Sequence, residues 1–183
     1  LKEGRKEVFP LVMKRYSEAV RRFPQSGRVG RTYVRMAQAE AFMGRNYDAL
    51  ASLDMAIGRY PEGSHLPLAY LTRGKVYLRL NQPEKAVRDL KVVLSRFPHS
   101  SVVEEAHYEI AKYLYSVGAY KEAKKRFSEL LEKDPDFYLK FPGFLSFMAQ
   151  TSLYLKDYET ARNYYFKALN LGHQPESEDL LLA

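Results

Sequence analysis

Apolar and small residues between positions 69 and 98 recur with the period of an α-helix, first before Pro83 and again after it. A proline fits the first turn of a helix, where its missing N–H is not needed, so Pro83 marks the start of a second helix. Pro98 ends that helix, because it biases the preceding residue away from helical geometry. The segment therefore predicts two short antiparallel helices joined by a tight turn. The residues expected on their facing sides are Tyr70, Gly74, Tyr77, Ala86, Leu90 and Val93.

The same pattern recurs with a spacing of 37 residues, counted between the prolines that stop the second helices. The stops are Phe23-Pro24, Tyr60-Pro61, Phe97-Pro98 and Asp134-Pro135. Three core positions precede each stop at constant intervals: Val12/Tyr16/Ala19, Ala49/Leu53/Ala56, Ala86/Leu90/Val93 and Ala123/Phe127/Leu130, with Ala161/Tyr165/Ala168 in the last copy. Such self-similarity indicates a repeat architecture whose units share a continuous core. Small residues, such as Gly74 and Ala111, are expected where helices cross most closely.

The repeat resembles the tetratricopeptide repeat (TPR), a helix–turn–helix unit of 34 residues. The copy from Ala106 to Pro135 carries Ile110-Ala111, Leu114, Gly118, Tyr120, Ala123, Phe127 and Leu130 at the positions of the TPR pattern. Arg73 and Glu40 depart from it, because these positions are usually apolar, and so does Ser152, where a tyrosine is usual. The resemblance implies an all-α fold, a right-handed α-solenoid of antiparallel helix pairs, and a non-enzymatic role in protein binding.

We expect a single TPR array over residues 1–183. It comprises a half-repeat with only the second helix (1–28), four repeats (29–65, 66–102, 103–139 and 140–174) and the start of a truncated helix (175–183). Neither end has the polar cap that an array requires, and the first residue is Leu1, so we expect an internal fragment of a longer array. The apolar faces at its ends predict end-to-end self-association. Between Asp134 and Gly143, one extra residue and Pro142 shift the spacing.

An aromatic-Pro-x-Ser pattern follows the second helices, as in Phe23-Pro24-Gln25-Ser26 and Phe97-Pro98-His99-Ser100. It resembles the TPR subfamily of bacterial envelope proteins, such as outer-membrane assembly lipoproteins. This resemblance implies a part in an envelope assembly, secretion or cell-surface machine and a periplasmic or outer-membrane-associated location, with a cytoplasmic one left open. A helix stop followed by an N-cap serine also explains the pattern.

Composition excludes several kinds of site. The chain has no cysteine, which rules out disulfides, thiolate catalysis and cysteine–zinc sites. The four histidines lack metal-ligand spacing, and neither a glycine-rich phosphate loop nor a Gly-x-Ser-x-Gly motif occurs. No apolar stretch is long enough to span a membrane. We therefore predict no catalytic residue, no metal and no cofactor.

Positive charge is concentrated near the N-terminus. The net charge of the chain is +7, and the excess of Lys and Arg lies entirely within residues 1–35. An anionic partner, such as nucleic acid or another anionic polymer, is the alternative function that this charge suggests. A solvated helix face explains it as well, and no aromatic-interleaved RNA motif accompanies it, so nucleic acid is not the favoured partner.

The free flank of each first helix is the predicted binding surface, on the inner curve of the stack. Its residues are Arg35, Gln38, Phe42, Leu71, Lys75, Arg79, Tyr108, Lys112, Tyr115, Phe147, Gln150 and Tyr154. Amide and cationic groups suit backbone carbonyls or acidic side chains, and aromatic rings suit anchors, which predicts an acidic or aromatic-accepting protein segment as partner. Alternatively, half or more of these aromatics pack between repeats. The carboxylate clamp of chaperone-type TPR proteins is not expected, because Gln38 and Thr72 replace its asparagines.

Overall fold

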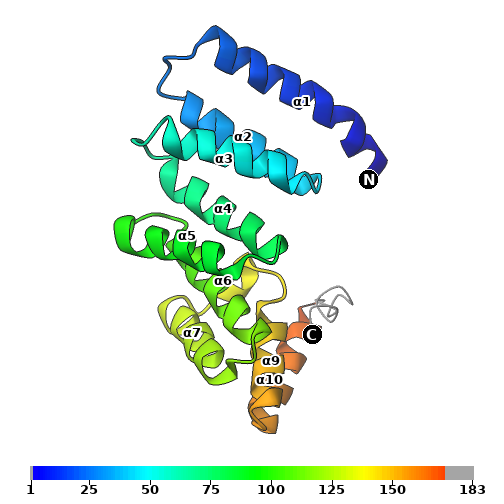
Figure 1. Cartoon of the computed structure of the whole chain (residues 1–183). Coiled ribbons are helices and arrows are strands. Elements are labelled where there is room, and N and C mark those ends of the chain that lie inside the picture. Colours follow the sequence, from blue (N-terminus) through cyan, green and yellow to red (C-terminus); the bar gives the residue numbers. More distant parts are fainter. Residues whose placement is uncertain (1, 172–183) are drawn as a thin grey trace. The chain divides into compact units, whose positions relative to one another are not determined.

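The computed structural model describes the backbone of residues 2–171 and the side chains of residues 8–171. That part of the chain contains ten α-helices and no strand (Figure 1). The helices belong to two compact units, the first ending at Val103 and the second beginning at Glu104. This division lies next to the predicted boundary between repeats 66–102 and 103–139. The all-α expectation is confirmed, whereas the single array over residues 1–183 stays a prediction.

The first unit consists of a single helix, α1, and two helix pairs that follow it along the chain (Figure 1). Its helices are α1 (Lys2–Arg22), α2 (Val29–Phe42), α3 (Asn46–Gly58), α4 (Leu66–Arg79) and α5 (Pro83–Arg96). Helix α2 packs against α3 and α4 packs against α5, while α3 contacts α4 and α1 contacts α2. Helices α1, α3 and α5 all end within three residues of a predicted stop proline, as the sequence predicts.

The second unit contains one helix that the sequence did not predict. Its helices are α6 (Val103–Ser116), α7 (Tyr120–Lys133), α8 (Phe137–Lys140), α9 (Phe144–Tyr154) and α10 (Tyr158–Asn170). Helix α9 packs against α10 and α7. The additional helix is α8, a single turn in the segment where only a shift of spacing was predicted. The truncated helix predicted at 175–183 lies outside the described residues.

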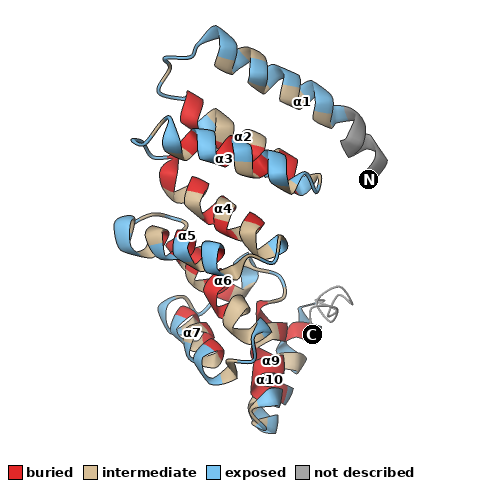
Figure 2. Cartoon of the chain, in the orientation of Figure 1, coloured by how far each residue is buried: buried red, intermediate tan, exposed pale blue. Residues whose placement is uncertain are grey.

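Buried positions confirm the repeat register in the second helices. The residues at the predicted core positions of α3, α5 and α7 are all buried: Ala49, Leu53, Ala56, Ala86, Leu90, Val93, Ala123, Phe127 and Leu130. In α1 the corresponding Val12 and Tyr16 are half-buried and Ala19 is exposed, and α2 is the helix against which α1 chiefly packs. Figure 2 accordingly draws no buried residue in residues 8–22 of α1. The exposure of Val8 and Leu11 on α1 fits the expectation of an open apolar face, while self-association itself stays a prediction.

Small residues lie at close helix crossings, as predicted. A Cβ atom on Gly74 would meet two side-chain carbons of Leu90 at 3.1 Å and the carbonyl oxygen of Ala86 at 3.4 Å. Glycine therefore allows α4 to approach α5 closely. Ala111 is fully buried in α6, within the core of the second unit.

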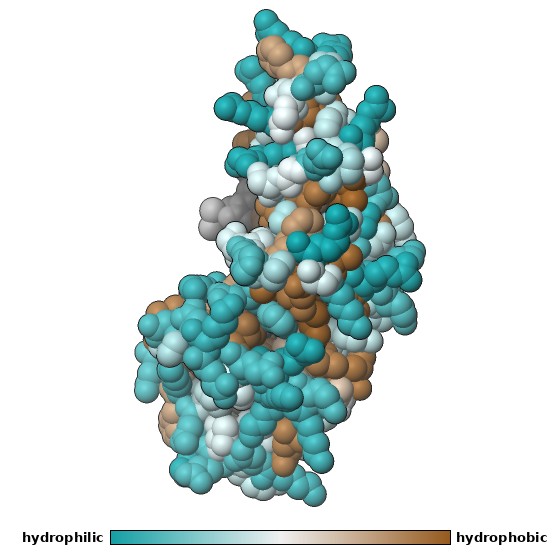
Figure 3. All heavy atoms as spheres, turned by 90° about the vertical axis from the view of Figure 1, so that its left-hand side faces the viewer, coloured by the Kyte–Doolittle hydropathy of each residue, from teal (hydrophilic) through white to brown (hydrophobic). Residues whose placement is uncertain are grey.

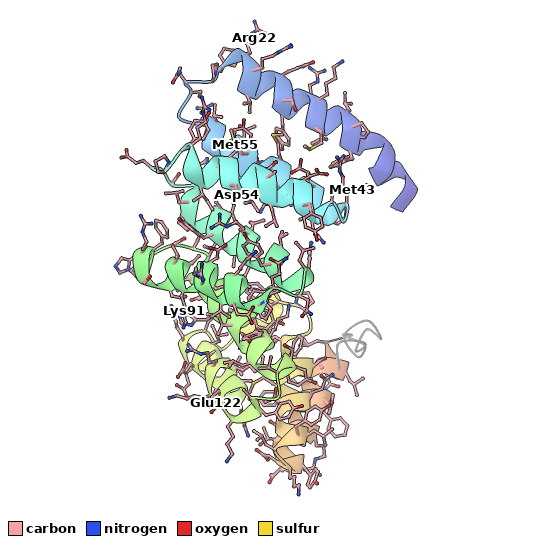
Figure 4. The ribbon with its side chains drawn as sticks, viewed as in Figure 1. Arg22, Met43, Asp54, Met55, Lys91 and Glu122 are labelled. Carbon is pink, nitrogen blue, oxygen red and sulfur yellow. The ribbon has the colours of Figure 1, made fainter. Side chains whose placement is uncertain are left out.

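Two of the three polar departures from the TPR pattern, Glu40 and Arg73, are paired with other side chains, whereas Ser152 is buried and its Oγ has no hydrogen-bond partner. Ser52 donates a hydrogen bond of 2.7 Å to the buried Glu40 carboxylate. Burial raises the pKa of Glu40, and the bond from Ser52 partly opposes that shift. Arg73 makes two hydrogen bonds to Asp89, of 2.7 and 2.9 Å, and a third of 2.7 Å to Asp54, which is labelled on α3 in Figure 4. Each pairing joins different helices of the first unit.

The turn inside each helix pair contains one residue with a positive φ. These residues are Gly44 (76°), Asn81 (53°), Gly118 (78°) and Lys156 (61°). The following residue donates its N–H to a carbonyl five positions back, in the pairs Arg45–Glu40, Gln82–Tyr77, Ala119–Leu114 and Asp157–Ser152. This is the bonding of a Schellman cap, which closes the C-terminus of a helix. Glycine and asparagine adopt the left-handed region readily, whereas lysine is strained there.

Replacing Lys156 with glycine is therefore expected to increase the free energy of unfolding by about 1 kcal/mol, because glycine has no Cβ to strain the left-handed backbone. Urea titration followed by circular dichroism measures the change. Lys156→Ala removes the same charge but keeps a Cβ, so it should give no comparable gain. If both substitutions increase the free energy of unfolding equally, the effect comes from the lost charge and not from backbone strain.

Candidate functional site

A pocket opens in the first unit where α2, the start of α4 and the loop after α5 meet, and we call it the α2–α4 pocket. Its volume is about 420 Å³, within the range of pockets that hold small molecules. The lining residues are Arg31, Val34, Arg35 and Gln38 on α2, then Ser64, His65, Pro67 and Leu68, and finally Ser100, Ser101 and Val102.

Helix α2 supplies one continuous face to this pocket. Positions 31, 34, 35 and 38 are three or four residues apart, so their side chains share one side of the helix. Val34 is fully buried, whereas Arg31 and Arg35 are exposed. Arg31 Nη2 donates a hydrogen bond of 3.0 Å to Ser64 Oγ, which holds this guanidinium beside the start of α4.

A buried histidine joins α3 and α4 below the same pocket. His65 Nε2 lies 3.2 Å from the carbonyl oxygen of Ala56. Gly30 on α2 leaves room for the ring, because a Cβ at this position would lie 2.3 Å from Nε2. The position of His65 in the sequence carried no signal of this burial.

The serines of the aromatic-Pro-x-Ser pattern do not cap the following helices, so the N-cap interpretation is wrong. The N-cap residues of α2 and α4 are Arg28 and His65, and neither makes a side-chain capping bond. Ser26 Oγ accepts the N–H of Arg28, and Ser100 Oγ accepts that of Val102, each two residues further on. These serines stabilise the turn before the helix, and Ser100 is thereby placed in the pocket lining.

The α2–α4 pocket is electropositive. No aspartate or glutamate belongs to its lining, which contains Arg31 and Arg35. Arg28 precedes them on the same side of α2, and all three are exposed. None of these arginines forms an ion pair with a described residue of the chain. Part of the N-terminal positive charge seen in the sequence therefore lies at the pocket.

The predicted binding residues of α2 and α4 have different environments. Arg35 and Gln38 line the pocket, and Phe42 is exposed near the end of α2. Leu71 is only 1% exposed, so it has no surface to offer a partner. Lys75 is half-buried on α4.

Arg79 has a structural contact in addition to its exposed surface. Its Nη1 donates a hydrogen bond of 3.0 Å to the carbonyl oxygen of Ala41, near the C-terminus of α2. A cation close to a helix C-terminus is also favoured by the helix dipole. Arg79 thus ties α4 to the preceding helix pair.

In the second unit, Tyr108 belongs to an aromatic core. It is 4% exposed, and its ring centroid lies 5.2–6.3 Å from those of Phe127, Phe137, Phe141, Phe144 and Phe147. Lys112 lies over the rings of Tyr108 and Phe147, with its Nζ 3.4 Å from a carboxylate oxygen of Glu109. The buried Tyr108 has no surface for a partner to contact. It packs inside the structure, as the alternative interpretation of these aromatics predicted.

Tyr115, Gln150 and Tyr154 form a second group. The hydroxyl of Tyr115 donates a hydrogen bond of 2.6 Å to Gln150 Oε1. Burial raises the pKa of Tyr115 to about 12, and Tyr154 and Tyr120 add to the shift. Tyr154 stacks on Tyr120 with centroids 4.3 Å apart but keeps 51% of its surface exposed. Of this group, Tyr154 offers the most accessible ring.

Neither a metal site nor a membrane span is found in the part of the chain that the structure describes. No three histidine, aspartate or glutamate side chains there are arranged to hold a metal ion. The helices described are too short or too polar to cross a bilayer.

Residues 68–100 match the family model of the Tetratricopeptide repeat. This segment includes most of α4, the turn after it, and all of α5. The chain contains a tetratricopeptide repeat. The resemblance stated from the sequence is thereby confirmed for the helix pair from which the pattern was first read.

Solved TPR structures share the fold. The crystal structure of MamA has a TM-score of 0.68 and 17% sequence identity, and the match covers 92% of this chain and 91% of that one. A tetratricopeptide repeat protein from Parabacteroides merdae has a TM-score of 0.70 and 17% identity, with 93% and 62% covered. At this identity the likeness is evidence of fold alone, and it confirms the predicted α-solenoid class.

A protein with a similar sequence has a name that states its role. The outer membrane protein assembly factor BamD of Xylella fastidiosa is 25% identical over 115 residues, which is 53% of this chain. The match covers 39% of BamD, so this chain spans about two fifths of the length of that relative.

Proposed function

We propose that this chain is a non-enzymatic scaffold that binds protein partners within a bacterial envelope assembly, secretion or cell-surface machine. The tetratricopeptide repeat at residues 68–100 carries the scaffold part of the proposal. The similarity to an outer membrane protein assembly factor supports the envelope context, and with it a periplasmic or outer-membrane-associated location.

The proposed contact surface is the free flank of the first helices, and the proposed partner is an acidic or aromatic-accepting protein segment. Arg35, Gln38 and Tyr154 keep accessible surface, and Lys75 and Lys112 are half-buried. Figure 3 shows hydrophobic side chains gathered between hydrophilic ones on the face that it presents. Apolar area bordered by polar groups is typical of surfaces that bind proteins.

Lys75→Glu/Lys112→Glu is expected to reduce recovery of protein partners in a pull-down from the native source, because two cations that attract an acidic segment become anions. Circular dichroism checks that the variant is folded. Lys91→Glu/Lys125→Glu makes the same charge change at exposed positions of the second helices and should recover partners normally. Equal recovery by wild type and Lys75→Glu/Lys112→Glu would remove this flank as the binding surface.

A further inference from the structure

We propose that the α2–α4 pocket of the first unit binds a carboxylate side chain of an acidic segment in a partner protein. The inference rests on the proposed protein-binding function and assigns it a recognition site. Only Arg35 and Gln38 of this pocket belong to the surface predicted from the sequence, while Arg31 and the three serines were not part of it.

Two positive charges in the α2–α4 pocket are not balanced by an acidic side chain. Arg31 and Arg35 are four residues apart on α2, where like charges repel each other. The described part of the chain supplies neither of them with a carboxylate partner within ion-pair distance. An anion bound between the two guanidinium groups would relieve this repulsion. Arginine is also the side chain that pairs with carboxylates through two parallel hydrogen bonds.

The wall of the α2–α4 pocket offers hydrogen-bond donors next to apolar side chains. The bond from Arg31 to Ser64 holds one guanidinium in place before any ligand arrives. Ser100 uses its oxygen to accept the N–H of Val102, which leaves its hydroxyl hydrogen available for donation. Pro67 and Leu68, which are half-buried, provide apolar surface beside these donors. The combination suits an acidic side chain followed by an apolar one.

The lining of the α2–α4 pocket suits a protein segment better than nucleic acid. Single-stranded nucleic acid is held by aromatic side chains on which bases stack, together with a basic groove along the backbone. The lining of the α2–α4 pocket contains no phenylalanine, tyrosine or tryptophan. A compact volume of about 420 Å³ with two arginines fits one or two side chains rather than a track of phosphates. The geometry therefore favours an acidic peptide.

The test is fluorescence anisotropy with the full chain and three labelled probes. One probe is a six-residue peptide of alternating glutamate and leucine, the second replaces each glutamate with glutamine, and the third is a short oligothymidylate. Wild type should bind the glutamate peptide about tenfold more tightly than the glutamine peptide, because charged hydrogen bonds are lost in the latter. Arg31→Gln/Arg35→Gln should weaken binding of the glutamate peptide by about tenfold or more.

Arg59→Gln/Arg88→Gln is the matched control, since it removes two exposed arginines of the same unit outside the pocket. It should bind the glutamate peptide as wild type does, and melting curves should be similar for all three proteins. If both variants bind the glutamate peptide equally weakly, the loss is an effect of net charge alone and the proposal is overturned. Absence of binding to the glutamate peptide, or tighter arginine-dependent binding of oligothymidylate, would overturn it as well.

Failure of the pocket and failure of the scaffold function are distinguished by a pull-down. If Arg31→Gln/Arg35→Gln recovers the same protein partners as wild type, the pocket assignment fails while the scaffold function stands. If wild type recovers no partner from its native source, the scaffold function itself fails. Loss of specific partners in Arg31→Gln/Arg35→Gln, with normal recovery by Arg59→Gln/Arg88→Gln, supports both.

Discussion

Replacing Arg73 with methionine is expected to lower the free energy of unfolding by about 3–5 kcal/mol, among the largest effects of any single substitution in this chain. Arg73 is the centre of an ion network that links α3, α4 and α5, and its partner Asp89 is buried. Removal of the guanidinium leaves the Asp89 carboxylate without its partner in a poorly solvated position. The cost arises mainly from this uncompensated charge.

Two further variants distinguish the contribution of the buried Arg73–Asp89 pair to stability from that of the exposed Arg73–Asp54 pair. Asp54→Asn breaks only the outer contact of Arg73, and because Asp54 is well exposed the loss should stay below about 1 kcal/mol. Arg73→Met/Asp89→Leu removes both buried charges, so it should recover most of the stability lost in Arg73→Met.

Urea unfolding followed by circular dichroism measures all three differences. A loss in Arg73→Met no greater than that in Asp54→Asn would show that Asp89 is readily solvated. The ion network would then contribute little to the packing of the helix pairs.

Phe137→Ala is expected to cost about 3–5 kcal/mol, because it removes a large side chain that is fully buried in the second unit. The Phe137 ring lies 4.7 Å from that of Phe141 and 5.1 Å from that of Phe144, measured between centroids. It also meets Tyr108 of α6 edge-on at 5.8 Å. The substitution leaves a cavity at the point where α8 joins this core.

Leu139 provides a control within the same four-residue helix. Its side chain is 58% exposed, so Leu139→Ala should change the free energy of unfolding by no more than about 0.5 kcal/mol. Thermal or urea unfolding compares the two variants. Similar small losses of stability in both variants would mean that the backbone of its turn stabilises α8 and that the Phe137 ring contributes little.

Much of the fold followed from short-range rules. Proline stops and the three core positions of each second helix were correctly predicted, because both depend on local backbone geometry and on the 3.6-residue period. Helix α8 was missed, because a four-residue helix has too few positions to show a period. Its formation depends instead on burial of Phe137 against residues distant in sequence.

The candidate site was only partly predictable. Helical spacing correctly placed Arg35 and Gln38 on one face of α2, and both line the α2–α4 pocket. The same rule could not foresee that Leu71 and Tyr108 are buried while Tyr154 stays accessible. Periodicity assigns a residue to a face of its helix, whereas exposure depends on what packs against that face.

By itself, the sequence determined the repeat, its register, the helix ends and the TPR class, since each is encoded in residues a few positions apart. Only the tertiary structure decided how the unusual polar residues are accommodated. Arg73 finds Asp89 sixteen residues away and Asp54 nineteen residues away, on two other helices. The tertiary structure also decided that Ser64 and Ser100 lie at the same pocket as Arg31 and Arg35. Such pairings depend on side chains that reach across helix interfaces, where no local pattern specifies the partner.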